Sequence, residues 1–560
     1  MKRFRTQFLL AAALALAVPA VSTAAVITIV NNDGAGEGFN DPTAAAPVGG
    51  NTGTTLGQQR LNVFQHAANI WGAALPSNIE IKVNAQFNPL SCSATSGVLG
   101  SAGPTTLFAD FAGAPLTGHW YHVALANKLA NDDLNTTSYE INATFNSSVG
   151  GATCLTVGWY LGLDGNEGSQ IELLPVVLHE LGHGLGFSTT TNGQTGAWNT
   201  TRPSIFDHFL YDPATGLHWD SASMSNAQRA ASGIGCNKLA WDGAQVVAHV
   251  HDFLGSKPVL TVTAPAGVAG DYAVGSATFG PPLSSTPVTG QVVLVADNFG
   301  NPTNGCETIT NNLSGKIAFI DRGTCTFPVK VKNAQNAGAI GVIVADSVAG
   351  CPPAGMGGAD ATITIPSVRI TLADGNLLRA QIANGLTATL ISDPAKVAGG
   401  DALNRVLMYS PTTYASGSSI SHFDTSAEPS LLMEPAITGG LSSNIDLTRQ
   451  AFADIGWFTG ALDVPPVARR ATLEPSAPNP MAAATTIAWT LSRDENVDLR
   501  IYDITGREVT RLAGGRMAEG RHSIVWNGTN ARGERMAPGV YQYRLRTPSL
   551  DEQRSVVIVR

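Results

Sequence analysis

Residues 171–188 read IELLPVVLHELGHGLGFS and hold two histidines four positions apart. On a helix, His179 and His183 would lie one turn apart on the same face, so both imidazoles could hold one metal ion. Glu180 follows the first histidine directly, and its carboxylate would reach a water on that metal. These residue types at this spacing predict a zinc hydrolase in which Glu180 is the general base.

The flanking residues predict the helix that this geometry needs. A chance HExxH in a chain with 11 His has a probability on the order of 1 in 100, which favours a metal site over a structural histidine pair. Pro175 is tolerable in the first helical turn, and Gly186 would let the helix end and the chain turn sharply. The apolar residues at helical spacing are Leu173, Leu174, Val177, Leu178, Leu181 and Leu185.

The third metal ligand has several candidates. Catalytic zinc takes three protein ligands and keeps a fourth position for water, whose pKa falls to about 7. A loop-closure estimate favours a histidine near the helix, but reaching His422 instead of His208 would cost only about 2 kcal/mol. The histidines between the helix and residue 255 that could supply the ligand are His208, His218, His249 and His251.

The first 24 residues predict a secretory signal peptide. Lys2, Arg3 and Arg5 precede an apolar run over residues 8–18, and a small-residue stretch ends at Ala24. This run is too short for a membrane span, and no second stretch of about 18 apolar residues follows. We therefore expect an exported protein with no membrane span in its mature chain.

The composition predicts several β-rich domains. The 560 residues exceed the size of one domain, only 13% are charged, and 60 Gly and 31 Pro indicate many turns. The net charge of -9 argues against nucleic acid or an anionic membrane as the main partner. Six cysteines suit disulfides in an oxidising compartment, and none forms a CxxC zinc motif.

Short patterns before the HExxH stretch predict a helix and two strands. Residues 56–75 carry an apolar face at helical spacing, and residues 79–87 alternate as a strand. Residues 138–145 also alternate, with Tyr139, Ile141, Ala143 and Phe145 on one face. That strand could lie at the edge of a cleft and pair with an extended peptide, or it could be an ordinary strand of the sheet.

From residue 258 to residue 394 the sequence pattern is typical of β-rich structure. Within it, residues 315–346 predict a strand, a loop, a helix and a strand. This block resembles a protease-associated (PA) domain. The resemblance implies a non-catalytic module, usually inserted in or appended to a secreted peptidase, that gates or binds protein substrates. Cys306 and Cys325 lie within it and could form a disulfide.

HELGHGLGF, together with SHFD at residues 421–424 and LMEP at 432–435, resembles the leishmanolysin-like branch of the metzincin zinc peptidases. In that branch an insertion displaces the third histidine, and a methionine-bearing turn follows it. Carried over, the resemblance implies zinc ligands at His179, His183 and His422, with Glu180 as general base and Met433 beneath the metal. Thr189 stands where the compact metzincin pattern has its third histidine.

The region after His422 continues the pattern. Met433 comes 11 residues later in a turn-like LLMEP, and residues 446–456 read as a capped amphipathic helix with Asp446 at its start. This context favours His422 as the third ligand, with His208 as the next candidate.

Residues 475–560 alternate short β runs with turns. They resemble the small immunoglobulin-like domains related to the flagellar hook-cap protein and to type IX secretion sorting tails. The resemblance implies a structural role, or one in export and surface attachment.

The predicted architecture is an α+β multidomain chain, a metzincin-like peptidase domain interrupted by a PA domain and followed by a β-sandwich. The expected boundaries are a signal peptide (1–24), the first peptidase part (25–257), the PA domain (258–394), the second peptidase part (395–460), a linker (461–474) and the Ig-like domain (475–560).

The predicted function is that of a secreted zinc metalloendopeptidase acting on proteins or peptides, with one catalytic Zn²⁺. An exopeptidase would need a group that fixes a free peptide terminus. A third hypothesis is a secreted adhesion or substrate-binding protein with a degenerate zinc site, although such a protein need not keep Glu180. Structural calcium and the oligomeric state stay open.

Overall fold

The computed structural model describes residues 23–236, 238–297, 300–436, 445–458, 472–473, 476, 478–491, 495–504, 507–518, 520–547 and 550–559. All but the last two residues of the predicted signal peptide lie outside these ranges, as does nearly all of the predicted linker. Within them, no helix has both the length and the apolar character that crossing a bilayer requires.

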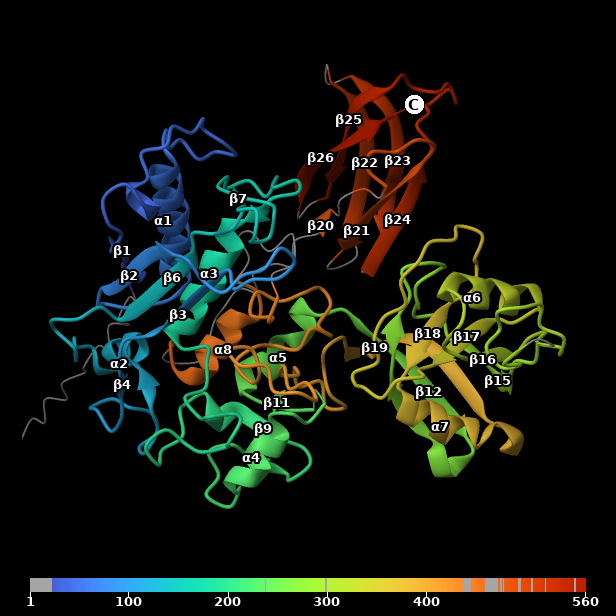
Figure 1. Ribbon diagram of the computed structural model, residues 1–560, viewed down its shortest axis with the longest axis horizontal. Helices are drawn as coiled ribbons and strands as arrows, with labels where there is room; N and C mark the ends of the chain where they lie inside the picture. The colour runs from blue at the N-terminus through green and yellow to red at the C-terminus, as the bar shows by residue number, and fades with distance from the viewer. Residues whose placement is uncertain are drawn as a thin grey trace, which may run out of the picture.

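The described elements form a mixed α/β, β-rich protein, and they gather into three groups along the chain (Figure 1). The blue to green elements of the N-terminal half surround α3, and the orange helix α8 lies among them although it comes late in the sequence. The yellow-green elements form a second group, and the red strands form a third.

The first group contains a four-stranded sheet in the order β1-β2-β6-β3. The strands β1 (Ile27–Asn31), β2 (Ile81–Asn88) and β6 (Ile141–Asn146) are parallel, whereas β3 (Gly100–Pro104) runs antiparallel to β6 at the end of the sheet. The predicted strand over residues 79–87 is confirmed as β2. The strand predicted over residues 138–145 is β6, which lies between β2 and β3. Of its two interpretations, the ordinary strand of the sheet is therefore correct.

Two helices pack together in this group, α1 (Leu56–Ala74) and α3 (Leu173–Leu185). The predicted helix over residues 56–75 is confirmed as α1, and its Trp71 indole donates a hydrogen bond to the Leu178 carbonyl of α3 at 3.0 Å.

The other elements of the first group are η1 (Gly38–Asn40), β4 (Leu107–Phe108), β5 (Tyr121–His122), α2 (Val123–Ala130), β7 (Trp159–Tyr160), β8 (Ile171–Glu172), η2 (Asp207–Phe209), β9 (Leu210–Asp212), β10 (Leu217–His218), α4 (Asn226–Ser232), β11 (Ala240–Trp241), α5 (Ala244–Phe253) and α8 (Thr448–Ile455).

One hydrophobic core joins the residues on both sides of the PA region. It contains buried side chains from residues 25–254 and from residues 397–457. Backbone hydrogen bonds also join the two flanks of the insertion. Trp241 N–H donates to Val406 O and Met408 N–H donates to Leu239 O, both at 2.8 Å. The two flanks therefore fold as one body.

The second group is an eight-stranded sheet in the order β13-β12-β19-β15-β16-β17-β18-β14. Alternate residues of β16 (Ile317–Asp321) enter two different cores, one that includes Leu378 of α7 and one that includes Val331 of α6. A continuous apolar run is what a strand covered on both faces requires. The other elements are β12 (Ser256–Ala264), η3 (Ala266–Val268), β13 (Gly270–Ala273), β14 (Gly275–Ser276), β15 (Val288–Leu294), α6 (Phe327–Asn336), β17 (Gly341–Ala345), β18 (Ser367–Ile370), α7 (Leu372–Arg379), η4 (Ile382–Asn384) and β19 (Thr387–Val397).

The third group consists of two antiparallel sheets, β20-β21-β24 and β23-β22-β25-β26, which share one core of their own. This arrangement agrees with the predicted β-sandwich. Its strands are β20 (Thr472–Leu473), β21 (Thr485–Leu491), β22 (Glu495–Asp503), β23 (Glu508–Met517), β24 (Gly520–Trp526), β25 (Gly539–Arg546) and β26 (Asp551–Ile558).

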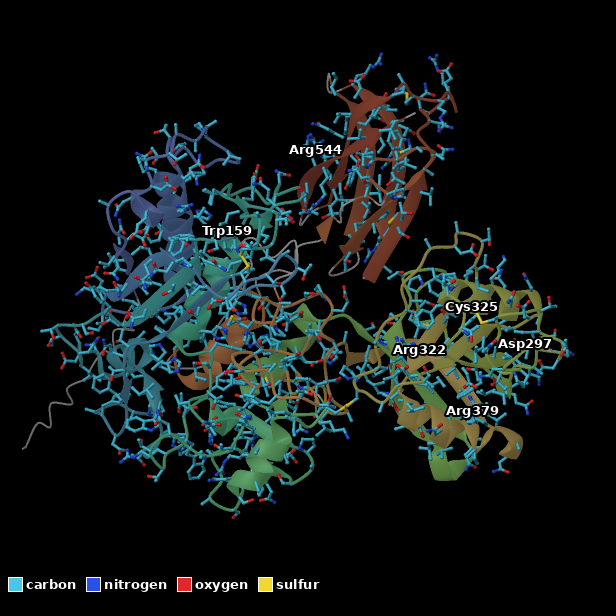
Figure 2. The ribbon with its side chains drawn as sticks, in the orientation of Figure 1. Trp159, Asp297, Arg322, Cys325, Arg379 and Arg544 are labelled. Atoms are coloured by element: carbon cyan, nitrogen blue, oxygen red, sulfur yellow. A yellow bond between two sulfur atoms is a disulfide. The ribbon has the colours of Figure 1, made fainter. Side chains whose placement is uncertain are left out.

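All six cysteines form disulfides, which confirms the expectation drawn from their even number. Cys306 pairs with Cys325 inside the second group, where Figure 2 labels Cys325. Cys236 pairs with Cys351 and so ties the first group covalently to the second, while Cys92 pairs with Cys154 within the first.

Candidate metal centre

The helix α3 carries the HExxH residues through the middle of the first core. Pro175 lies in its first turn, as predicted, and every residue of the helix except His183 is buried. The helix ends at Gly186, whose φ of 132° is a conformation that side-chain-bearing residues rarely adopt. The predicted role of Gly186 as the helix end is therefore confirmed.

The glycines inside HELGHG allow close packing. A Cβ on Gly182 would lie 2.8 Å from the Met433 sulfur, and a Cβ on Gly184 would lie 2.5 Å from Cγ2 of Ile141. Neither residue could carry a side chain without displacing these neighbours. The HExxH helix thus approaches β6 on one side and the Met433 segment on another.

Replacing Gly184 with alanine is expected to lower the free energy of unfolding by up to about 2 kcal/mol, because overlap with Ile141 outweighs the gain in helix propensity. Better helix propensity gains about 1 kcal/mol, but overlap with a packed side chain costs typically about 1–3 kcal/mol, and three Ile141 atoms lie within 2.9 Å of the new Cβ. Urea unfolding of both proteins measures the difference. Gly103→Ala is the control, since its added Cβ meets nothing within 4 Å; equal stability of Gly184→Ala and wild type would contradict the prediction.

The structure brings three histidines together at one point. The Nε2 atom of His179 lies 3.1 Å from that of His183 and 3.1 Å from that of His422, and the His183 and His422 atoms are 3.2 Å apart. His422 comes from the segment after the second group, 239 residues beyond His183. Within the described residues, one cluster of metal-ligating side chains contains these three.

The other nitrogen of each ring has a backbone partner. His179 Nδ1 lies 2.7 Å from Leu432 O, His183 Nδ1 lies 2.8 Å from Phe187 O, and His422 Nδ1 lies 2.7 Å from Ser418 O. A carbonyl oxygen can only accept, so each Nδ1 carries the proton and each neutral ring leaves a lone pair on Nε2. Burial also lowers the pKa of His179 to about 3 and that of His183 to about 4, which favours the neutral rings.

Three converging lone pairs repel one another unless a cation lies between them. Tetrahedral ligands about 2.0–2.1 Å from a zinc ion are separated by roughly 3.3 Å, close to the observed 3.1–3.2 Å. Backbone carbonyls that hold the far ring nitrogen are the usual outer partners of zinc-binding histidines. This donor set fits Zn²⁺.

Glu180 lies on the same helix beneath the edge strand β3. Its side chain is 9% exposed, and a Cβ on Gly100 of β3 would lie 3.1 Å from its Cγ. Burial raises the pKa of Glu180 to about 8, although a hydrogen bond from the Ala102 backbone opposes the shift. A carboxyl group in this environment can both take up and release a proton near neutral pH.

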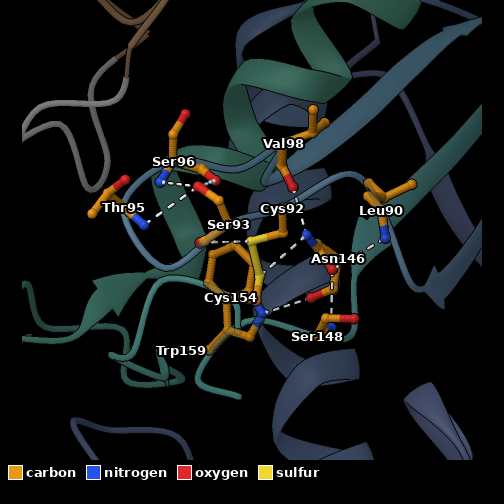
Figure 3. The surroundings of a disulfide bond; sticks show 10 residues. All are labelled: Leu90, Cys92, Ser93, Thr95, Ser96, Val98, Asn146, Ser148, Cys154 and Trp159. Carbon is orange, nitrogen blue, oxygen red and sulfur yellow. Dashed lines mark hydrogen bonds between the residues drawn. A yellow bond between two sulfur atoms is a disulfide. The ribbon is translucent and has the colours of Figure 1, made fainter. Parts of the chain in front are cut away.

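The disulfide between Cys92 and Cys154 holds the loop that leads into β3 (Figure 3). Asn146, at the end of β6, is fully buried beside it and donates to the Val98 carbonyl at 2.8 Å. The Asn146 carbonyl accepts a hydrogen bond from the Trp159 indole at 3.1 Å. These contacts fix the chain just before the strand that covers Glu180.

Met433 is fully buried and lies against Gly182 of the HExxH helix. The preceding residue, Leu432, accepts the hydrogen bond from His179, and its own N–H donates to the buried carboxylate of Asp446. The predicted capped helix is α8, whose N-cap is Leu447; Asp446 lies one residue earlier and accepts from Thr448 N–H at 3.0 Å. The turn around Met433 is thus held from both sides.

The other candidate ligands lie elsewhere. His208 pairs with Asp220, His218 with Asp242 and His249 with Asp252, at 2.6, 2.6 and 2.9 Å. His251 is exposed on α5. None of these four belongs to the cluster formed by the HExxH histidines.

Sequence reasoning missed the edge strand and a neighbouring cavity of about 600 Å³. The strand β3 reads GSAGP, which has no β-branched or aromatic residue and so no strand signal. His122 lines the cavity, and burial lowers its pKa to about 4. The remaining lining residues are Pro104, Thr105, Thr106, Leu107, Trp120, Ser188, Thr189, Thr190, Asn199 and Thr200.

Two family models match this chain. A model described as the PA domain matches residues 288–378, and one described as the FlgD Ig-like domain matches residues 480–549. The predictions of a PA domain and of a hook-cap-related Ig-like domain are thereby confirmed. Residues 171–188 and His422 lie outside both matches.

Several curated and solved proteins are similar over part of the chain. The ER degradation-enhancing alpha-mannosidase-like protein 3 of Xenopus laevis is 38% identical over 133 residues, which are 22% of this chain and 14% of that protein. The minor extracellular protease Vpr of Bacillus subtilis is 35% identical over 78 residues, 14% of this chain and 9% of its own length. A solved zinc aminopeptidase from Bacillus subtilis is 24% identical with a TM-score of 0.19, covering 25% of this chain and 31% of that one. The chain therefore spans less than a third of each of these proteins.

Proposed function

We propose that this protein is a secreted, zinc-dependent metalloendopeptidase of the leishmanolysin-like metzincin type. The observation that carries the proposal is the convergence of three Nε2 atoms, from His179, His183 and His422, to within 3.2 Å of one another on and beside the helix that bears Glu180. Bound zinc would polarise a peptide carbonyl and lower the pKa of a water to about 7.

The residues of the chain have separate roles in this proposal. Glu180 takes a proton from the attacking water on a carboxylate oxygen and passes it to the nitrogen of the leaving amine. The carbonyls of Leu432, Phe187 and Ser418 keep the three histidines in the tautomer that binds metal. Met433 supports the helix through its contact with Gly182.

The edge strand β3 favours an endopeptidase. Among the described residues it pairs with β6 alone, and it stands at the end of the sheet order. An extended peptide can add to such an edge by backbone hydrogen bonds along its length, without recognition of a free terminus. Because Gly100 and Ala102 of this strand contact Glu180, a peptide there would run past the proposed general base.

The accessory domains give the competing hypothesis its support. A PA domain and an Ig-like domain could serve a secreted adhesion or substrate-binding protein, in which the metal centre is a remnant. Cleavage of casein by the purified protein, its loss after treatment with 1,10-phenanthroline and its return with added zinc test the proposal. A zinc-loaded, folded protein that leaves casein and unfolded proteins intact would favour the binding protein.

Export to an oxidising compartment accompanies this function. Three disulfides are typical of secreted proteins, and the N-terminal residues read as a signal peptide. Protein or peptide substrates outside the cell are the proposed partners, and the Ig-like domain would serve export or attachment to the cell surface.

Removal of residues 461–560 is expected to change zinc content and peptide hydrolysis by less than about twofold, because the β-sandwich has its own core and every proposed ligand lies upstream. Metal analysis and a peptide assay on the truncated protein check this. A truncated protein that folds but no longer holds zinc would contradict the boundary.

A further inference from the structure

A second cluster of metal-ligating side chains lies in the same group of elements. Asp220 Oδ2 is 3.2 Å from His119 Nε2 and 2.6 Å from His208 Nδ1. One ligand atom from each of the three residues lies within 4.8 Å of the others. They come from the chain just before β5, from η2 and from the chain just after β10, so the fold brings three separate segments to one point.

The partners of the two His119 ring nitrogens require a positive charge between this ring and Asp220. Its Nδ1 lies 2.9 Å from the Thr117 carbonyl, which can only accept, so Nδ1 carries a proton. The neutral ring would then turn the Nε2 lone pair toward a carboxylate oxygen 3.2 Å away. Two electron-rich atoms are stable at that distance only with a cation or a second proton between them.

The distance between His119 and Asp220 suits two ligands of one metal ion, whereas His208 would have to move slightly to admit that ion. Ligand atoms about 2.0–2.1 Å from a zinc ion lie roughly 3.3 Å apart, which matches the distance between His119 and Asp220. The 2.6 Å between His208 and Asp220 is the length of a direct hydrogen bond. The His208 side chain is 42% exposed, so it can rotate outward to admit an ion.

We propose that His119, His208 and Asp220 form a second divalent-cation site, which binds Zn²⁺ or a similar borderline metal. Two imidazoles with one carboxylate favour Zn²⁺ over Ca²⁺ or Mg²⁺, which prefer oxygen ligands. Water would complete the coordination, because two of the three side chains are 15% exposed and the third is half exposed.

This site is connected to the wall of the cavity beside the first centre. Asp207, next to His208, is fully buried and accepts hydrogen bonds from the hydroxyls of Thr189 and Thr191, in the segment that follows α3. Trp120, next to His119, and Thr189 both line the cavity of about 600 Å³. An ion at the second site would therefore hold the segment with Trp120 and the segment with Thr189, which both line the cavity, in fixed relative positions. The site stands independently of the proposed peptidase activity.

Zinc stoichiometry tests the site. The full-length protein is equilibrated with excess ZnCl₂, freed of unbound metal by gel filtration and analysed for zinc per chain. We expect two equivalents in the wild type and one in either Asp220→Asn or His208→Ala, while the control His249→Ala, whose histidine pairs with Asp252 on α5, keeps two. His208→Ala removes a half-exposed side chain, so loss of folding does not obscure the result.

A second measurement isolates the new site. In His422→Ala, zinc is expected to raise the Tm, and in the double variant His422→Ala with Asp220→Asn it is expected to have no effect on Tm. One equivalent in the wild type that disappears in His422→Ala and persists in Asp220→Asn would overturn the second site. It would mean that protons alone join the two histidines to Asp220. One equivalent lost only with Asp220→Asn would instead overturn the first centre.

Discussion

Glu180→Gln is expected to lower the turnover of a protein substrate by about 10²–10⁴-fold while zinc stays bound. The three histidines that would hold the metal remain, and glutamine keeps the shape of the buried side chain, but an amide cannot take a proton from water. A fluorogenic peptide assay and metal analysis of the same preparation measure both effects.

Glu172→Gln is the matched control, because Glu172 is a buried glutamate at the start of the same helix. The same substitution there is expected to leave turnover within about twofold of the wild type, since Glu172 lies two turns from the histidine pair. Near-normal turnover of Glu180→Gln would refute the general-base role. A large loss in Glu172→Gln would show that any buried charge change on this helix disturbs the site.

His422→Ala is expected to remove one equivalent of zinc and to abolish detectable peptidase activity. Catalytic zinc takes three protein ligands, and only two remain, both on α3. The cavity left by one imidazole is small beside a core that spans both flanks of the insertion, so the variant should stay folded by circular dichroism. His249→Ala, an unrelated histidine on α5, should keep both metal and activity.

A folded His422→Ala protein with unchanged zinc content and activity would overturn the ligand assignment. A variant of the second cluster, His208→Ala, distinguishes two further outcomes. If His208→Ala, and not His422→Ala, removes activity together with a zinc equivalent, the compact alternative considered from the sequence gains support. If His208→Ala removes zinc but keeps activity, both metal sites stand as proposed.

The distance along the chain from His183 to His422 is no obstacle, because the inserted domain brings its ends together. Its first strand, β12, pairs antiparallel with its last, β19, in a register that sets Ser256 opposite Val397. Immediately outside this pair, Ala398 N–H donates to Gly255 O at 2.8 Å. The first group of elements therefore closes a short gap rather than a loop of more than a hundred residues, and the entropic cost is correspondingly smaller.

The local features of the HExxH helix could be predicted from the sequence because they depend on neighbours within a few residues. The i and i+4 spacing of His179 and His183, the early Pro175 and the terminal Gly186 follow from helix geometry alone. The stripe at Leu447, Ala451, Phe452 and Ile455 was equally readable, and all four residues are buried. The PA and Ig-like domains are predictable from long patterns, and the family matches to residues 288–378 and 480–549 fall inside the predicted ranges.

Tertiary structure decided the features that depend on residues distant in the sequence. The strand β3 lacks strand-forming residues and exists because β6 supplies its hydrogen bonds, so the pattern over residues 138–145 suggested the wrong strand as a candidate edge. The pairing of His119 with Asp220 across 101 positions has no sequence signal, and neither has the contact of Met433 with Gly182. By itself the sequence determined that His179 and His183 could bind one metal ion, because that depends on side-chain chemistry and helical spacing. Which further residues meet them at one point depends on how sheets and inserted domains close distant segments on one another, and only the folded chain determines that.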